Sequence, residues 1–154
     1  MRKINCTVIV GLLGGLLICD KAIKSDHKRM KRETERLDDY YHLLVQWMRN
    51  KHDGWRISDY FEKNEYKKVA VYGMGEIGDL LYEDLKEAGI RVDYSIDQAG
   101  GSHFRELHGY TLEDDLPEVD VIIITPIFAI DAITNKLKKV TNAKLVSIKD
   151  VIYD

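Results

Sequence analysis

Residues 68–97 read KVAVYGMGEIGDLLYEDLKEAGIRVDYSID, and this stretch decides the fold. It predicts a short apolar strand over residues 69–72, then a glycine turn, and then a helix that stops at Gly89. A second strand follows over residues 90–96 and closes at Asp97. The helix should turn one apolar face to the sheet, formed by Ile77, Leu81, Leu85 and Ala88, with Leu80 beside them.

The six residues after the first strand fit the pattern G-x-G-x-x-G and are Gly73, Met74, Gly75, Glu76, Ile77 and Gly78. In a dinucleotide site the three glycines have separate tasks. Gly73 allows the tight turn out of the strand, Gly75 lets a pyrophosphate approach the backbone, and Gly78 lets the helix pack closely on the strand. Because N–H groups at the start of a helix attract phosphates, these six residues form a candidate nucleotide site.

An acidic residue completes this pattern. Asp97 lies nineteen residues after Gly78, where an acid can accept hydrogen bonds from ribose hydroxyls. If the ligand is a nicotinamide cofactor, NAD(P), the acid favours NAD over NADP because it repels a 2′-phosphate. The alternative is a domain that keeps the glycine turn for packing and binds nothing.

The rest of the chain continues the alternation of strands and helices. We expect a short strand near residues 108–110, a helix start at 111–114, a buried strand at 119–125, a helix at 129–139, a last strand at 145–148 and a final turn at 150–153. This alternation predicts an α/β fold with a small parallel sheet in the order 3-2-1-4-5. Residues 73–78, Asp97, Thr125 and Pro126 should line the crevice where the strand order reverses.

The N-terminal segment, residues 1–19, is basic and then apolar, and we interpret it as a single-pass membrane anchor. Its apolar run is short for a spanning helix, which needs about 20 residues. A signal-peptide core, a lipidated cysteine and a buried helix are therefore alternatives. Seven basic residues follow within residues 21–36, against two before the apolar run. This bias predicts that the bulk of the chain lies on the cytoplasmic side of the cell membrane.

Residues 20–64 are expected to form a helical linker, and residues 65–154 a nucleotide-binding domain. One long helix over residues 20–50 carries a heptad pattern that is half-formed at its start and good at its end. The first seam position holds Ile23, Met30, Leu37 and Leu44, and the second holds His27, Thr34, Tyr41 and Met48. Two interpretations stay open. The helix forms a parallel coiled-coil homodimer, or its end packs onto the domain through Tyr40, Tyr41, Leu44, Trp47 and Met48.

Charge is distributed unevenly along the 154 residues. Residues 1–64 contain 13 Lys and Arg against 9 Asp and Glu, whereas residues 65–154 contain 10 against 17. An acidic globular part argues against nucleic-acid binding, which needs a basic face. Cys6 and Cys19 both lie in the apolar segment and make no paired metal motif, so we expect no metal.

No catalytic role is assigned from the sequence. Tyr82 and Lys86 match the Tyr-x-x-x-Lys pair of short-chain dehydrogenases, but they stand in the helix directly after the glycine turn. Their spacing is interpreted as one helical turn, and the P-loop pattern is absent. Four other candidates lie near the crevice. His103 and His108 are interpreted as exposed loop histidines, and Asp114 and Asp115 as acids at a helix start.

A resemblance extends over residues 40–154. The residues that support it are Trp47 and the stretches 57–85, 94–97, 119–126 and 145–148. They resemble the small Rossmann-like domains of bacterial surface-polysaccharide and sugar-nucleotide proteins. The resemblance implies NAD(P) or a nucleotide-sugar as ligand, held at Gly73, Gly75, Gly78 and Asp97. Such domains are commonly coupled to a transferase or epimerase module, and no such module is visible in this sequence.

Three functional hypotheses follow. The first is a membrane-tethered domain that binds a nucleotide and serves as an accessory or regulatory part of cell-surface polysaccharide biosynthesis, with an enzyme of that process as its partner. The second is an NAD-dependent oxidoreductase or sugar-nucleotide-modifying enzyme whose site is completed by a partner subunit. The third is a ligand-free structural domain.

Overall fold

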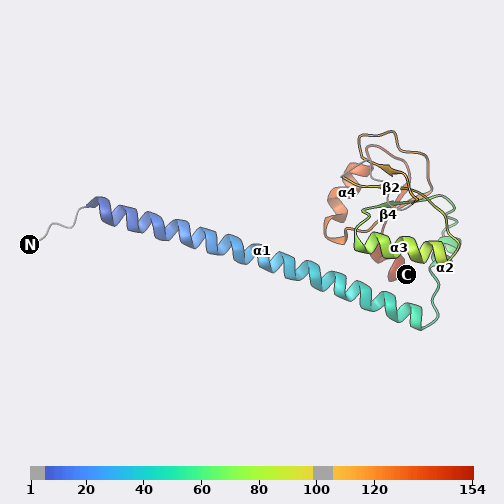
Figure 1. Cartoon of the computed structure of the whole chain (residues 1–154), viewed down its shortest axis with the longest axis horizontal. Helices are drawn as coiled ribbons and strands as arrows, with labels where there is room; N and C mark the ends of the chain where they lie inside the picture. Colours follow the sequence, from blue (N-terminus) through green and yellow to red (C-terminus); the bar gives the residue numbers. More distant parts are fainter. Residues whose placement is uncertain (1–5, 99–105) are drawn as a thin grey trace, which may run out of the picture. The chain divides into compact units, whose positions relative to one another are not determined.

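The structure is a computed structural model, and it describes residues 6–98 and 106–154, with side chains from residue 23 onward (Figure 1). The chain divides into two compact units, Met1–Asp39 and Tyr40–Asp154. The boundary falls inside the segment that the sequence predicts as a linker.

The second unit is built around one parallel sheet. Its strands are β1 (Val69–Tyr72), β2 (Val92–Ile96), β3 (Gly109–Tyr110), β4 (Val121–Ile124) and β5 (Lys144–Ser147). The spatial order is β3-β2-β1-β4-β5 and every neighbouring pair is parallel, so the predicted order is confirmed. All four residues of the central strand β1 are buried, as expected for a strand covered on both faces.

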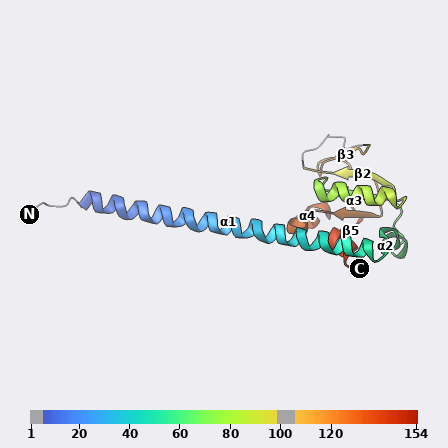
Figure 2. The same cartoon turned by 60° about the horizontal axis from the view of Figure 1, so that its bottom comes forward.

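The helices are α1 (Cys6–His52), α2 (Ile57–Lys63), α3 (Glu76–Glu87), α4 (Ile130–Leu137) and α5 (Ile148–Ile152), with a 3₁₀ turn, η1 (Ile127–Ala129), before α4 (Figures 1 and 2). Helices α3 and α4 cover opposite faces of the sheet. Leu81 of α3 packs in one core cluster with Val71 of β1. Ile133 of α4 packs in the other cluster with Ala70 of the same strand. Since neighbouring strand residues point to opposite faces, the two helices lie on different sides.

The face that α3 turns to the sheet differs from the predicted one at three positions. Leu81 and Leu85 are buried as expected, and Tyr82 joins them. Leu80 is 45% exposed, and Ala88 is exposed as well. Leu80 is exposed because successive residues on a helix are about 100° apart, which turns its side chain away from the buried stripe.

Residues 111–114 form a hydrogen-bonded turn, so the helix start predicted there is wrong. The backbone N–H and the hydroxyl of Thr111 donate to the Asp114 carboxylate at 2.7 and 2.8 Å. These two hydrogen bonds lower the pKa of the Asp114 carboxyl. The same signal, a Thr followed three residues later by an acid, predicts either structure, because the side chain satisfies N–H groups in a helix cap or in a turn.

The final turn predicted over residues 150–153 is instead the short helix α5. Ser147 begins it with a capping box. The Ser147 side chain accepts from the Lys149 N–H, and the Asp150 carboxylate accepts from the Ser147 N–H. Val151 and Ile152 are buried and pull the helix onto the core.

The C-terminal end of α1 packs into the second unit. Leu43 and Trp47 are buried there, and Tyr40 and Leu44 are partly buried against the same core cluster. The predicted packing of this end is thus confirmed in part. Tyr41 and Met48, which the prediction included, are exposed.

One carboxylate holds this helix end in place. The Trp47 indole N–H donates to Oδ2 of Asp84 in α3 at 2.8 Å, and Lys51 lies 2.7 Å from Oδ1 of the same group. The hydrogen bond to Asp84 raises the pKa of Lys51. The Asn50 side-chain amide also donates to the carbonyl of Ile152.

Within the residues that the structure describes, no helix is both long and apolar enough to span a membrane. The anchor inferred from residues 1–19 stays a prediction.

A second carboxylate joins the starts of β1 and β4. Oδ2 of Asp120 accepts from the N–H groups of Lys67 and Lys68 at 2.7 and 2.8 Å. These N–H groups stabilise the charged form, so they lower the pKa of Asp120 below its usual 3.8.

We expect Trp47→Ala to destabilise the protein by about 3–5 kcal/mol, because it leaves a cavity and removes one of the two hydrogen-bond partners of Asp84. Arg49→Ala, two residues away and exposed, should change the free energy of unfolding by less than about 0.5 kcal/mol. Urea denaturation followed by circular dichroism measures both. Equal stability of the two variants would contradict this packing of α1.

Asp120 should contribute stability that is fully present above pH 3.8 and is lost as the pH falls through its lowered pKa. Asp120→Ala should therefore unfold at lower urea concentration than the wild type at pH 7, and the gap should narrow at pH 3. Glu118→Ala, which removes an exposed acid nearby, should leave the urea midpoint nearly unchanged. A gap that is constant with pH would show that the charge of Asp120 has no such role.

Candidate functional site

The glycine turn leaves β1 at the carboxyl edge of the sheet. Gly73 has a φ of +89°, a left-handed conformation that L side chains rarely adopt. Its N–H donates to the Ile96 carbonyl of β2 at 2.9 Å. A Cβ atom here would lie 2.8 Å from the Pro126 ring and 2.9 Å from the Thr125 hydroxyl. The chain therefore requires glycine at this position, whether or not a ligand binds.

The other two glycines differ sharply in their surroundings. A Cβ atom on Gly78 would lie 2.2 Å from the Gly73 carbonyl oxygen, so Gly78 lets α3 press against the turn. Gly75 caps the start of α3 and is exposed, and a Cβ atom there would meet nothing within 4 Å. Two glycines are thus needed by the fold, and the middle one is left open for a close approach.

Thr125 and Pro126 follow β4 and lie against the glycine turn. The Thr125 hydroxyl is directed at the Gly73 carbonyl at 2.6 Å and at the Tyr72 carbonyl at 3.2 Å. The Thr125 N–H donates to the same Tyr72 carbonyl at 3.1 Å. These contacts join β1 and β4 where the strand order reverses. In this arrangement the Thr125 hydroxyl hydrogen-bonds to backbone carbonyls at the end of the neighbouring strand.

Asp97 directly follows β2 and also contacts the glycine turn. Its Oδ2 accepts from the Met74 N–H at 3.3 Å, and its own N–H donates to the Tyr110 carbonyl at 3.0 Å. The residue is half-buried. The structure therefore places Asp97 beside the turn, as the spacing predicts. The hydrogen bond from Met74 also makes its carboxylate a structural support of the turn, a role that the sequence did not indicate.

The charges around the start of α3 are negative. Glu76 and Asp79 stand in its first turn, and Asp97 lies beside it. Acids here are favourable for the helix dipole. They also repel phosphate groups, so the backbone N–H groups of the turn would have to supply the attraction for any phosphate.

Ile77, the remaining residue of the motif, is half-buried and packs against the core cluster on the α3 side of the sheet. It helps to set the position of the helix rather than offering a polar group.

Among the residues that the structure describes, the others weighed from the sequence do not gather into a reactive group. His108 is exposed, and its ring lies 4.5 Å from that of Tyr110. His103 lies outside the described residues. The Lys86 ammonium stands 5.9 Å above the ring of buried Tyr82, a cation–π contact along one helical turn. Over residues 6–98 and 106–154, no three His, Cys, Asp or Glu side chains come together in a way that could hold a metal ion.

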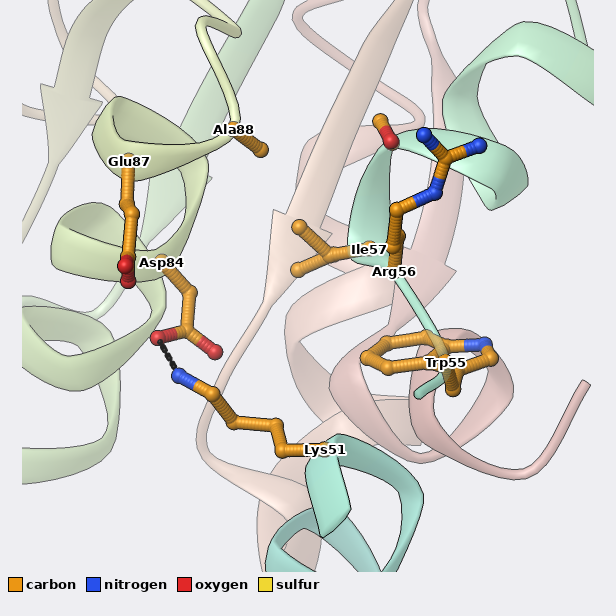
Figure 3. A pocket seen from close by; sticks show the side chains of 8 residues that line it. Lys51, Trp55, Arg56, Ile57, Asp84, Glu87 and Ala88 are labelled. Carbon is orange, nitrogen blue, oxygen red and sulfur yellow. Dashed lines mark hydrogen bonds and ion pairs between the residues drawn. The ribbon is translucent and has the colours of Figure 1, made fainter. Parts of the chain in front are cut away.

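Two open cavities lie near the opposite, amino edge of the sheet. The first, of about 340 Å³, is lined by Lys51, Trp55, Arg56, Ile57, Ser58, Asp84, Glu87 and Ala88 (Figure 3). The second, of about 620 Å³, adjoins it and includes Phe61, Tyr66, Lys67, Gly89 and Asp120. The sequence did not indicate either one, because their walls combine segments far apart in the chain. In open parallel sheets ligands bind at the carboxyl ends of the strands, so the glycine turn stays the better candidate.

Comparisons with protein-family models, with curated proteins and with solved structures found no match for this chain. The class that the fold itself defines is a small α/β domain with one parallel sheet of five strands in the order β3-β2-β1-β4-β5.

The roles of the glycines can be separated by matched substitutions. Gly78→Ala should lower the free energy of unfolding by about 1–3 kcal/mol, because a backbone carbonyl must move. Gly75→Ala meets no atom and should cost less than about 1 kcal/mol, the usual effect of losing a favourable helix cap. Thermal and urea unfolding of both variants measure the difference. A Gly78→Ala protein as stable as the wild type would refute the packing role.

Proposed function

We propose that the unit of residues 40–154 binds a nucleotide over the glycine turn, either NAD(P) or a nucleotide-sugar. The observation that carries the proposal is the open position of Gly75 between two constrained glycines, with Asp97 beside the turn. The fold has no packing need for glycine at position 75, and the missing Cβ atom leaves the room that a closely approaching pyrophosphate requires.

The carboxylate of Asp97 supports the choice among cofactors. An acid at the end of the second strand accepts hydrogen bonds from ribose hydroxyls and repels a 2′-phosphate. Glu76 and Asp79 add negative charge at the same end of α3. NAD is therefore favoured over NADP, and a ligand with few phosphates is favoured over one with many.

The proposed role is accessory or regulatory, in cell-surface polysaccharide biosynthesis. It rests on the resemblance of residues 40–154 to domains of such proteins. A tether at residues 1–19 would keep the domain on the cytoplasmic side of the membrane, near an enzyme that it serves. We assign no catalytic residue, since the groups around the turn that the structure describes supply no nucleophile with a base beside it.

Calorimetric titration of the full chain in mild detergent tests the proposal, with NAD, NADP, S-adenosylmethionine and UDP-sugars as ligands. We expect binding by NAD or a UDP-sugar, and we expect Gly75→Val to weaken it at least tenfold by filling the space that the pyrophosphate needs. Ala88→Val places the same side chain at the far end of α3, beside the two cavities, and should leave binding unchanged.

Asp97→Ala should also weaken binding, and its unfolding must be compared with that of the wild type because Asp97 holds the turn. No heat from any ligand at millimolar concentration would refute the proposal. Binding that Gly75→Val leaves intact but Ala88→Val removes would move the site to the opposite edge of the sheet.

A further inference from the structure

Helix α1 exposes large apolar side chains at a regular spacing. Ile23, Met30 and Leu37 are seven residues apart and are 63%, 69% and 65% exposed. The same spacing continues in the sequence to Leu44. Side chains of this size gain about 1.5–3 kcal/mol each when they are fully buried, so a row of them in water is costly.

The intervening positions complete a heptad pattern over four repeats. With the row above at position d, position a holds His27, Thr34, Tyr41 and Met48. Tyr41 and Met48 are 63% and 67% exposed, although Leu43 and Trp47 on the neighbouring face of the same helix are buried in the domain. Leu44 packs partly against the domain core, whereas the other seven a and d positions are exposed. We call these eight a and d positions the α1 seam.

We propose that the α1 seam pairs with the α1 seam of a second copy of this chain, as a parallel and in-register coiled coil. An a/d pattern sustained over four heptads is what two helices bury against each other. This inference does not depend on nucleotide binding, since the glycine turn takes no part in it.

Charges beside the seam favour the parallel arrangement. Asp26 and Glu33 occupy position g, whereas Lys24, Lys31 and Asp38 occupy position e. In a parallel pair each g residue faces the e residue five positions further along the other helix. Asp26 then faces Lys31 of the second copy, twice by symmetry, while Glu33 faces Asp38 unfavourably. An antiparallel pair would set the g positions of the two helices along one flank, where both carry acids, and the e positions along the other, where both carry lysines.

Two features of the seam fit a two-stranded assembly. His27 and Thr34 at position a are polar, and polar residues there specify register and number of strands at a cost in stability. Thr34 already satisfies its hydroxyl by donating to the Met30 carbonyl at 3.0 Å. The basic residues Lys28, Arg29 and Arg32 stand at positions b, c and f, so a dimer leaves them in water.

The mass of the full chain in mild detergent tests the pairing, measured by light scattering after size exclusion. We expect twice the chain mass of 17.8 kDa for the wild type and a single chain mass for Leu37→Glu. Arg32→Glu places the same side chain at the outward position f and should stay dimeric. A monomeric wild type overturns the proposal, and so does a dimer that survives Leu37→Glu or is lost in Arg32→Glu.

Disulfide trapping tests the orientation, in a chain in which Cys6→Ser and Cys19→Ser remove the native thiols. Thr34→Cys should cross-link to itself under mild oxidation, because identical a positions of a parallel pair lie within disulfide reach. Arg32→Cys should not, because position f faces outward. A dimer by mass that fails to cross-link through Thr34→Cys overturns the parallel register.

Discussion

The carbonyl group of Gly73 is the contact on which the second unit depends. The Thr125 hydroxyl at the end of β4 lies 2.6 Å from its oxygen, and Gly78 of α3 approaches the same oxygen so closely that no Cβ atom fits. One peptide group thus brings a strand, its neighbour and a helix together. The left-handed backbone of Gly73 aims this carbonyl, and therefore the position of α3 on the sheet follows from it.

This arrangement explains why so much of the fold could be predicted from a short stretch of sequence. The apolar run of β1 and the glycine spacing are local signals, and local signals are what a sequence displays directly. The place of Asp97 followed from the same counting, and the structure puts its carboxylate on the turn.

Features that were missed depend on partners distant in sequence. Asp84 accepts a hydrogen bond from Trp47, 37 residues away in the sequence, and neither local sequence predicts this pair. The apolar pattern predicted that Tyr41 packs onto the domain, but Leu43 is buried instead. The face of α1 that is covered depends on the shape of the domain and not on the helix sequence alone. At Thr111 the error has another origin. A side chain that can cap a helix can equally close a turn, and the residues that follow decide between them.

The attachment of α1 at Asp84 has a mechanical consequence. Asp84 stands eight residues after Glu76, the first residue of α3, which is about 12 Å along the helix at 1.5 Å per residue. The other end of that rigid rod is the glycine turn. A pull or twist on the last turns of α1 is therefore delivered, through an indole and an ammonium group, to the helix whose first turn forms the candidate site. Force applied to the last turns of α1 and the geometry of the glycine turn are therefore mechanically coupled through α3.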